Sequence, residues 1–256
     1  MQQQNQALAR YYNKKKKLKK RRKIAFYTLF VVLLICTVTI LSLTVFFNID
    51  SIAVNGNNHY TAQKIIDESG LKVGDNLFRL NKFKIIDNLK AKMPYLDTVE
   101  IDRKLPVSIE INVTESQDYM CILSGNDVLV VDKNLKILNR TDEAVEGLAT
   151  VYGVVPLTDK IGQVVTSENG ADATLLQLSG VLYDVFGADK ITSIDVSAAY
   201  DVRVRYEDRL DIEFGTLENI DEKVRLVEYV INENSKNEHA QIGFSSGNRV
   251  YYRAND

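Results

Sequence analysis

The chain has 256 residues, 45% of them apolar and 26% charged, which is the balance of a globular protein with one large or two small domains. This composition excludes a chain that is disordered throughout. Two Cys and two His are too few for a tetrahedral zinc site of the usual kind or for a disulfide framework. The net charge of −2 conceals an asymmetry, because residues 1–23 hold ten of the 32 cations and no acid, so that 22 cations face 34 acids in the remainder.

An uncharged apolar run, IAFYTLFVVLLICTVTILSLTVFF, occupies residues 24–47. A helix of about 20 residues already spans the hydrocarbon core of a bilayer, so this run predicts a membrane-spanning helix. A cleaved signal peptide would have an apolar region of only about 7 to 15 residues. The other alternative is a buried helix in a soluble core.

The basic residues directly before this run predict a cytoplasmic tail over residues 1–23, since positive charge stays on the cytoplasmic side. Residues 48–256 are then extracytoplasmic. We assign the basic run to topology and to contact with the lipid bilayer rather than to nucleic acid, because the adjacent anchor already accounts for it.

The first external segment has the pattern of a small two-layer domain. Thr61 is expected to cap the first helix, and Gly70 to end it in a left-handed conformation. Gly56 stands where the backbone must turn. The spacing of apolar residues predicts a strand at 51–56, helices at 62–69 and 83–93, and strands at 99–102 and 107–114 that pair as a hairpin.

Four motifs in this segment occur in a recognisable order: F-x-I-x-x-I-x-V-x-G-N from Phe47, G-x-N-L-F from Gly74, Pro94 after the second helix, and R-K-x-P from Arg103. With them, residues 48–116 resemble the POTRA domain of the FtsQ/DivIB cell-division family. Many members continue with Glu-Arg-x-Pro, whereas Glu115 is followed here by Ser-Gln-Asp. The resemblance therefore leaves the domain junction open.

Residues 117–256 are expected to form a second, β-rich domain that resembles the β domain of the same family. Overall the chain is expected to be an α+β protein. The predicted elements are strands at 120–123, 128–131 and 136–138, an apolar segment at 148–155, a helix through 175–185 that stops at Gly187, a hairpin of 202–206 with 210–214, a helix from Asn219 to Ile231, and strands at 241–244 and 249–253.

The inventory of chemical groups is poor for an enzyme. His59 is best explained as a turn residue, His239 lies in a polar loop, and Cys121 is expected to be a small buried core residue. There is no Gly-rich phosphate loop, no G-x-S-x-G and no H-E-x-x-H. The sequence predicts a binding protein with no catalytic residue, no cofactor and no metal.

The resemblance implies a division scaffold at the septum of the cell membrane. It implies binding to FtsB/DivIC-like and FtsL-like single-pass partners and, through them, a link to septal peptidoglycan synthesis. The physical mechanism we expect is strand addition to an exposed sheet edge. The residues we expect to bind the partner are those of the terminal strand: Arg249, Val250, Tyr251, Tyr252 and Arg253.

The terminal strand could instead be an ordinary strand that its own chain covers. A second, weaker candidate for docking is the short edge strand of the POTRA domain that contains Ile52 and Val54. The alternative function is a membrane-anchored cell-envelope sensor or cell-wall enzyme. An enzyme would need a polar cleft with shifted pKa values, which a scaffold does not.

Overall fold

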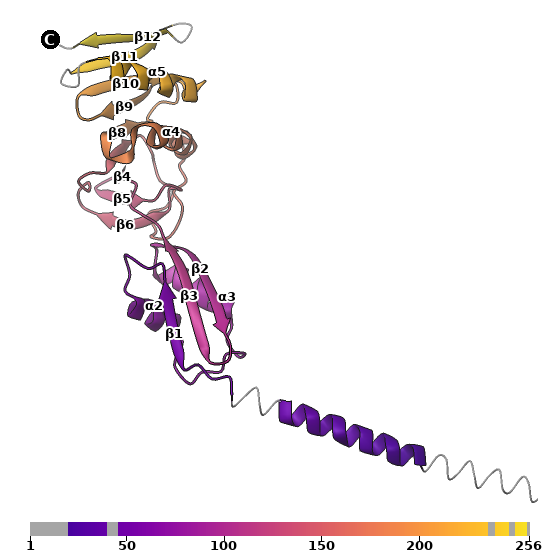
Figure 1. Cartoon of the computed structure of the whole chain (residues 1–256). Coiled ribbons are helices and arrows are strands. Elements are labelled where there is room, and N and C mark those ends of the chain that lie inside the picture. The colour runs from indigo at the N-terminus through magenta and orange to yellow at the C-terminus, as the bar shows by residue number, and fades with distance from the viewer. Residues whose placement is uncertain (1–19, 40–45, 235–238, 246–248, 255–256) are drawn as a thin grey trace, which may run out of the picture.

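The computed structural model describes residues 20–39, 46–234, 239–245 and 249–254. After an N-terminal helix (Lys20–Thr39), the chain forms two modules that lie end to end, so that its external part is elongated (Figure 1). The helix is long and apolar enough to cross a membrane. The hydroxyls of Thr28, Thr37 and Thr39 donate to helix carbonyls three or four residues back, so they are compatible with hydrocarbon.

The predicted span and the observed helix differ at the carboxyl end. Residues 40–45 lie outside the described part of the chain. Phe46 forms a bend, and the carbonyl of Phe47 accepts a hydrogen bond from the amide of Leu77 at 2.8 Å. Phe46 and Phe47, the last two residues of the predicted span, therefore lie at the entry to the first module. Phe47 packs against the core of this module, whereas Phe46 is exposed.

The first module has the predicted order of elements. They are β1 (Ser51–Asn55), α2 (Ala62–Ser69), α3 (Lys82–Lys92), β2 (Leu96–Lys104) and β3 (Ser108–Glu115). The strands form a sheet in the order β1-β3-β2, with β2 and β3 antiparallel as the predicted hairpin requires and β1 parallel to β3. The two helices pack on one face, where Ile65, Leu89 and Ile111 are fully buried.

The predicted capping residue and the predicted glycine turns at the ends of these elements are confirmed. The side chain of Thr61 accepts a hydrogen bond from the amide of Lys64, and Gly70 ends α2 with φ +71°. Gly56 follows β1 with φ +81°, and a Cβ at this position would stand 2.1 Å from the carbonyl oxygen of Val113. Only glycine fits this turn.

The second module is built on one nine-stranded sheet in the order β12-β11-β10-β9-β8-β7-β4-β5-β6. Helices α4 and α5 pack on one face of the sheet and complete the main core (Figure 1). The elements are β4 (Met120–Ser124), β5 (Asp127–Val131), β6 (Ile137–Thr141), β7 (Ala149–Tyr152), α4 (Ala171–Phe186), a short 3₁₀ turn η1 (Ala188–Lys190), β8 (Ile191–Asp195), β9 (Val202–Tyr206), β10 (Leu210–Gly215), α5 (Ile220–Glu233), β11 (Ala240–Ser245) and β12 (Arg249–Ala254).

Strand β8 is absent from the sequence-based prediction. Its two buried residues, Ile191 and Ile194, are three apart, and the register with β9 shifts between Ile191 and Ser193. This irregularity breaks the alternation of period two by which strands are recognised.

Helix α5 begins directly after Asn219, where the sequence predicts its start. Asn219 precedes the helix, but it has φ +55° and its side chain makes no capping hydrogen bond. Instead, the ammonium group of the buried Lys223 donates to the carbonyls of Phe214 (2.9 Å) and Thr216 (2.7 Å). Lys223 thus ties the first turn of α5 to the end of β10, and its burial lowers its pKa.

The two modules share contacts at their junction. Leu138 of β6 is buried in the core of the first module, whereas its neighbour Ile137 is buried in the core of the second. The hydroxyl of Tyr95 donates to Asp118 at 2.9 Å across the same boundary. Successive strand residues point to opposite faces, so one strand contributes to both cores.

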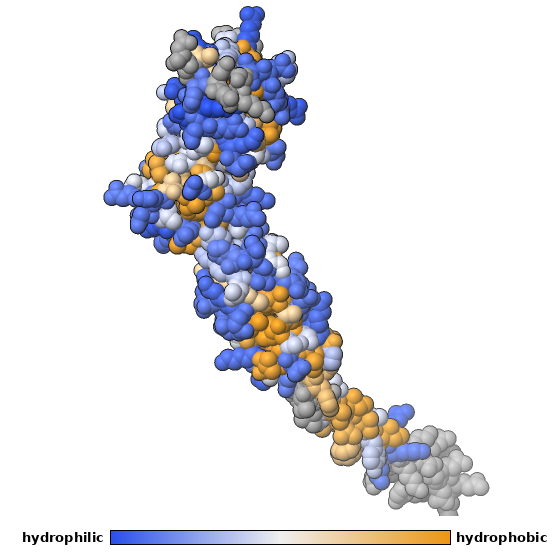
Figure 2. Space-filling model, turned by 60° about the vertical axis from the view of Figure 1, so that its left-hand side comes forward, coloured by the Kyte–Doolittle hydropathy of each residue, from blue (hydrophilic) through white to orange (hydrophobic). Residues whose placement is uncertain are grey.

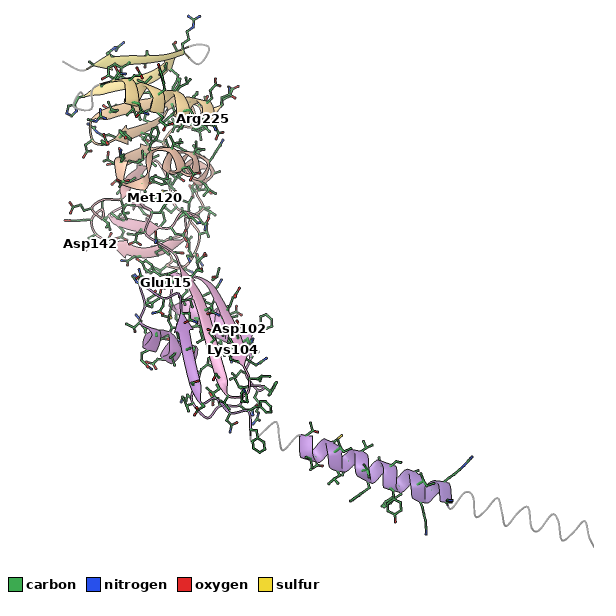
Figure 3. All side chains as sticks on the ribbon, in the orientation of Figure 1. Asp102, Lys104, Glu115, Met120, Asp142 and Arg225 are labelled. Carbon is green, nitrogen blue, oxygen red and sulfur yellow. The ribbon has the colours of Figure 1, made fainter. Side chains whose placement is uncertain are left out.

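Glu115, labelled in Figure 3, lies at this junction and orders the neighbouring loop. Its carboxylate accepts hydrogen bonds from the amides of Asn58, His59 and Tyr60. The ring of His59 stacks on Tyr95 with centroids 3.7 Å apart. The predicted turn residue His59 therefore helps to order the loop before α2.

Candidate partner-binding edge

Strand β12, which contains the five residues expected to bind a partner, is the last strand of the nine-stranded sheet. It pairs with β11 in antiparallel register, from Arg249 opposite Ser245 to Ala254 opposite Ala240. No other described segment pairs with its outer side. Within the described residues, the alternative that the chain covers its own terminal strand has no support.

The side chains of β12 alternate between the two faces of the sheet. Val250 and Tyr252 are partly buried and pack against the main core on the helical face. Arg249, Tyr251 and Arg253 occupy the alternate positions, and both arginines are exposed. The five predicted residues thus split into two that hold the strand on its core and three on the helix-free face.

Tyr251 ties the edge strand to the interior of the sheet. Its ring crosses Gly243 on β11, where a Cβ would stand 2.3 Å from the tyrosine hydroxyl. The hydroxyl donates to the carboxylate of Glu213 on β10 at 3.0 Å, and this hydrogen bond raises the pKa of Tyr251. Glu213 in turn lies 3.7 Å from the guanidinium of Arg203 on β9. A row of polar contacts therefore braces β12 across three further strands.

The hydrogen bonds that join β10, β11 and β12 determine which backbone groups of β12 point toward the open edge. The amide of Ala240 donates to the carbonyl of Arg209, so the backbone of Ala240 faces β10 and that of Gln241 faces β12. In an antiparallel pair, alternate residues bond to the neighbour. Arg249, Tyr251 and Arg253 bond to β11, and the N–H and C=O of Val250 point toward the open edge.

The opposite edge of the same sheet is protected. Gln163 and Gly162 bond to the two backbone groups of Ile137 in β6, at 2.8 and 2.7 Å, and Val165 bonds to the carbonyl of Leu135 at 2.8 Å. The loop that follows β7 therefore covers the outer side of the chain at residues 135–137, where β6 begins. Natural sheets cover edges in this way to prevent unwanted strand pairing.

The second predicted edge is β1 of the first module. It lies at the edge of the three-stranded sheet, but Ile52 and Val54 are half-buried and pack against the core of that module. Their side chains face inward. A partner at β1 would meet the backbone edge and the exposed side chains of Ser51, Ala53 and Asn55.

Comparison with known proteins identifies the first module and the family of the whole chain. Residues 47–116 match the family model described as "POTRA domain, FtsQ-type". The cell division protein DivIB of Clostridium acetobutylicum is 33% identical over 225 residues, which is 85% of this chain and 88% of the relative. DivIB of Clostridium botulinum (strain Loch Maree) is 29% identical over 230 residues, or 88% of this chain and 89% of the relative. FtsQ of Corynebacterium glutamicum is 23% identical over 214 residues, or 80% and 86%.

This chain belongs to the FtsQ/DivIB family of cell-division proteins. The first module is its POTRA domain. We call the nine-stranded module (residues 120–254) the β domain. The open terminal strand thus lies on the β domain, at the end of the molecule farthest from the N-terminal helix (Figure 1).

The β domain also carries a polar hollow on the helix-free face. A cavity of about 470 Å³ is lined by charged residues that pair with one another, among them Arg205 with Asp211 (3.6 Å) and Arg203 with Glu213. It has no Cys or His in its lining. In the described part of the chain, no three His, Cys, Asp or Glu side chains gather where they could hold a metal.

Cys121 of the β domain is fully buried against Val128 and Val130, as the sequence predicts. Burial raises the pKa of its thiol, and the amide of Val145 donates to the sulfur at 3.4 Å. We expect a thiol reagent at pH 8 to modify Cys121 in the folded protein at least 100-fold more slowly than in urea. The measurement uses a Cys36→Ser background, and equal rates in both states would contradict the buried thiol.

Proposed function

We propose that this FtsQ/DivIB chain is a non-catalytic scaffold of the divisome that binds FtsB/DivIC-like and FtsL-like partners by strand addition at β12. Its N-terminal helix anchors it in the cell membrane with residues 1–23 in the cytoplasm and both modules outside. It acts at the division septum and links to septal peptidoglycan synthesis through these partners.

The observation that carries this proposal is the difference between the two edges of one sheet. Residues 162–165 cover the beginning of the β6 edge, whereas no described segment covers any part of the β12 edge. An uncovered sheet edge offers unpaired N–H and C=O groups to a strand of another chain. Selective protection of one edge therefore supports a docking role for the other.

The side chains of β12 fit a charged extended segment. Arg249 and Arg253 flank Tyr251 on the helix-free face and are exposed, so they favour a partner strand with acidic residues. The contact of Tyr251 with Glu213 holds the strand in place before binding. A pre-ordered edge lowers the entropic cost of association.

A proline at Val250 tests the role of the backbone. Val250→Pro removes the N–H that points toward the open edge, whereas Val250→Ala loses the same packing against the core and keeps that N–H. We expect co-purification of the partners from membranes to fall about tenfold or more with Val250→Pro, since each lost 1.4 kcal/mol is a factor of ten.

Val250→Ala is the matched control, and circular dichroism checks that both variants are folded. Strand addition predicts that Val250→Ala retains most of the capture. Full capture by both variants would place the interface elsewhere, such as β1. Loss of capture by both folded variants would show that the partner reads the side chain rather than the backbone.

A further inference from the structure

The end of the POTRA domain at which the chain enters carries exposed large apolar side chains. Phe46, Val73, Phe78 and Leu105 are between 48% and 68% exposed, and Phe83 in the first turn of α3 is 81% exposed. We call these five residues the basal patch. Figure 2 shows apolar surface on the half of the POTRA domain that lies toward the N-terminal helix, bordered by hydrophilic surface.

Backbone contacts bring the segments of the basal patch to one end of the domain. The amide of Gly74 donates to the carbonyl of Ile49, and that of Asp50 donates to the carbonyl of Val107, at 2.8 and 2.7 Å. The loop of Val73 and the turn of Leu105 therefore both lie beside residues 47–50. The ring of Phe47 also contacts that of Phe78, with centroids 5.2 Å apart.

The start of α3 belongs to the same end. The guanidinium of Arg103, next to the turn of Leu105, donates to the carbonyls of Leu77 (2.7 Å) and Leu80 (3.1 Å), just before α3 begins. In Figure 3, Lys104 lies toward this end of the domain and Glu115 toward the junction with the β domain. The basal patch thus faces away from the β domain.

The length of chain between helix and domain limits the distance of the basal patch from the membrane. The helix is described to Thr39 and the domain begins at Phe46, so six residues connect them. Even a fully extended connection of this length spans at most about 25 Å. These residues, ILSLTV, carry no charge, which places the boundary between lipid and water close to Phe46.

Charge at this end suits the surface of an anionic membrane. Three exposed cations, Lys72, Arg79 and Lys84, form no ion pair with another described residue, and they outnumber the acids Asp50 and Asp75 in the loops beside them. Exposed cations near a membrane are attracted to anionic headgroups. Aromatic side chains such as Phe78 and Phe83 add apolar area that enters the boundary between headgroups and acyl chains.

We propose that the basal patch rests on the outer surface of the bilayer that the N-terminal helix spans, with Lys72, Arg79 and Lys84 on anionic headgroups. This inference depends on the membrane anchoring in the proposed function. It adds a second attachment of the POTRA domain to the membrane and thereby holds the long axis of the molecule away from the bilayer surface.

The absence of tryptophan from the chain allows a direct test. The full chain carrying Phe78→Trp is placed in vesicles of phosphatidylcholine and phosphatidylglycerol whose acyl chains are brominated, so that they quench nearby tryptophan. We expect at least a twofold loss of emission relative to unbrominated vesicles. Phe30→Trp, within the helix, is expected to be quenched as well, and Tyr229→Trp, exposed on α5 of the β domain, is not.

The possible outcomes distinguish the contact of the basal patch with the membrane from the anchoring of the N-terminal helix. Quenching of Phe30→Trp without quenching of Phe78→Trp would overturn the basal contact and leave the anchor intact. No quenching of Phe30→Trp would overturn the anchoring itself. Equal quenching at positions 78 and 229 would show a molecule lying flat on the membrane, and equal quenching of Phe78→Trp in vesicles of phosphatidylcholine alone would overturn the role of the cations.

Discussion

Replacement of Gly56 by alanine is expected to destabilise the POTRA domain by about 2 to 5 kcal/mol. A left-handed backbone costs an L-residue roughly 1 to 2 kcal/mol, and a forced contact in a packed region adds about 1 to 3 kcal/mol. Both apply here, because φ is +81° and the new Cβ would lie 2.1 Å from the carbonyl oxygen of Val113, which is backbone and cannot move aside cheaply. Hydrogen exchange of the POTRA amides in the full chain measures the loss.

Gly70→Ala in the same domain is the matched control. It has φ +71°, but no atom lies within 4 Å of the added Cβ, so only the strain of about 1 to 2 kcal/mol applies. Equal losses for the two variants would show that the contact with Val113 contributes nothing.

Leu138→Ala is expected to weaken the POTRA domain from a strand that belongs to the β domain. Removal of a buried leucine side chain typically costs about 2 to 5 kcal/mol. Because Leu138 is buried in the core of the POTRA domain, we expect faster hydrogen exchange in β2 and β3. Limited proteolysis should also cleave the junction near residues 116–118 more rapidly.

Ile137→Ala, one residue earlier, provides the comparison. Ile137 is fully buried in the core of the β domain, so its truncation should accelerate exchange in the β domain and leave β2 and β3 of the POTRA domain protected. If both variants accelerated exchange in the same domain, the division of β6 between two cores would be wrong.

The sequence predicts most of the fold because most elements follow a regular period. The hairpin of β9 and β10 alternates buried and exposed residues almost perfectly, and both helices of the POTRA domain end where Pro94 and Gly70 predict. Strand β8 is missed because its irregular register places Ile191 and Ile194 three apart. The parallel pairing of β1 with β3 joins segments more than 50 residues apart, and no local pattern encodes it.

The candidate site is predictable in part. The β-branched and aromatic residues Val250, Tyr251 and Tyr252 favour a strand. The contact of Tyr251 with Glu213 across Gly243 depends on a register of three strands. The protected edge at β6 depends on where a loop of low periodicity folds back. Neither can be read from local spacing.

With the membrane anchoring proposed above, the strand order also sets the height of the open edge above the membrane. Eight strand intervals separate β6 at the POTRA junction from β12, and neighbouring strands lie about 4.8 Å apart, so the open edge stands about 38 Å beyond that junction. The eight residues of β3 run along the POTRA domain and add about 27 Å. A partner anchored in the same bilayer must rise about 65 Å to reach the edge, which a continuous helix of about 43 residues would span. The scaffold would therefore select its partners by reach as well as by sequence.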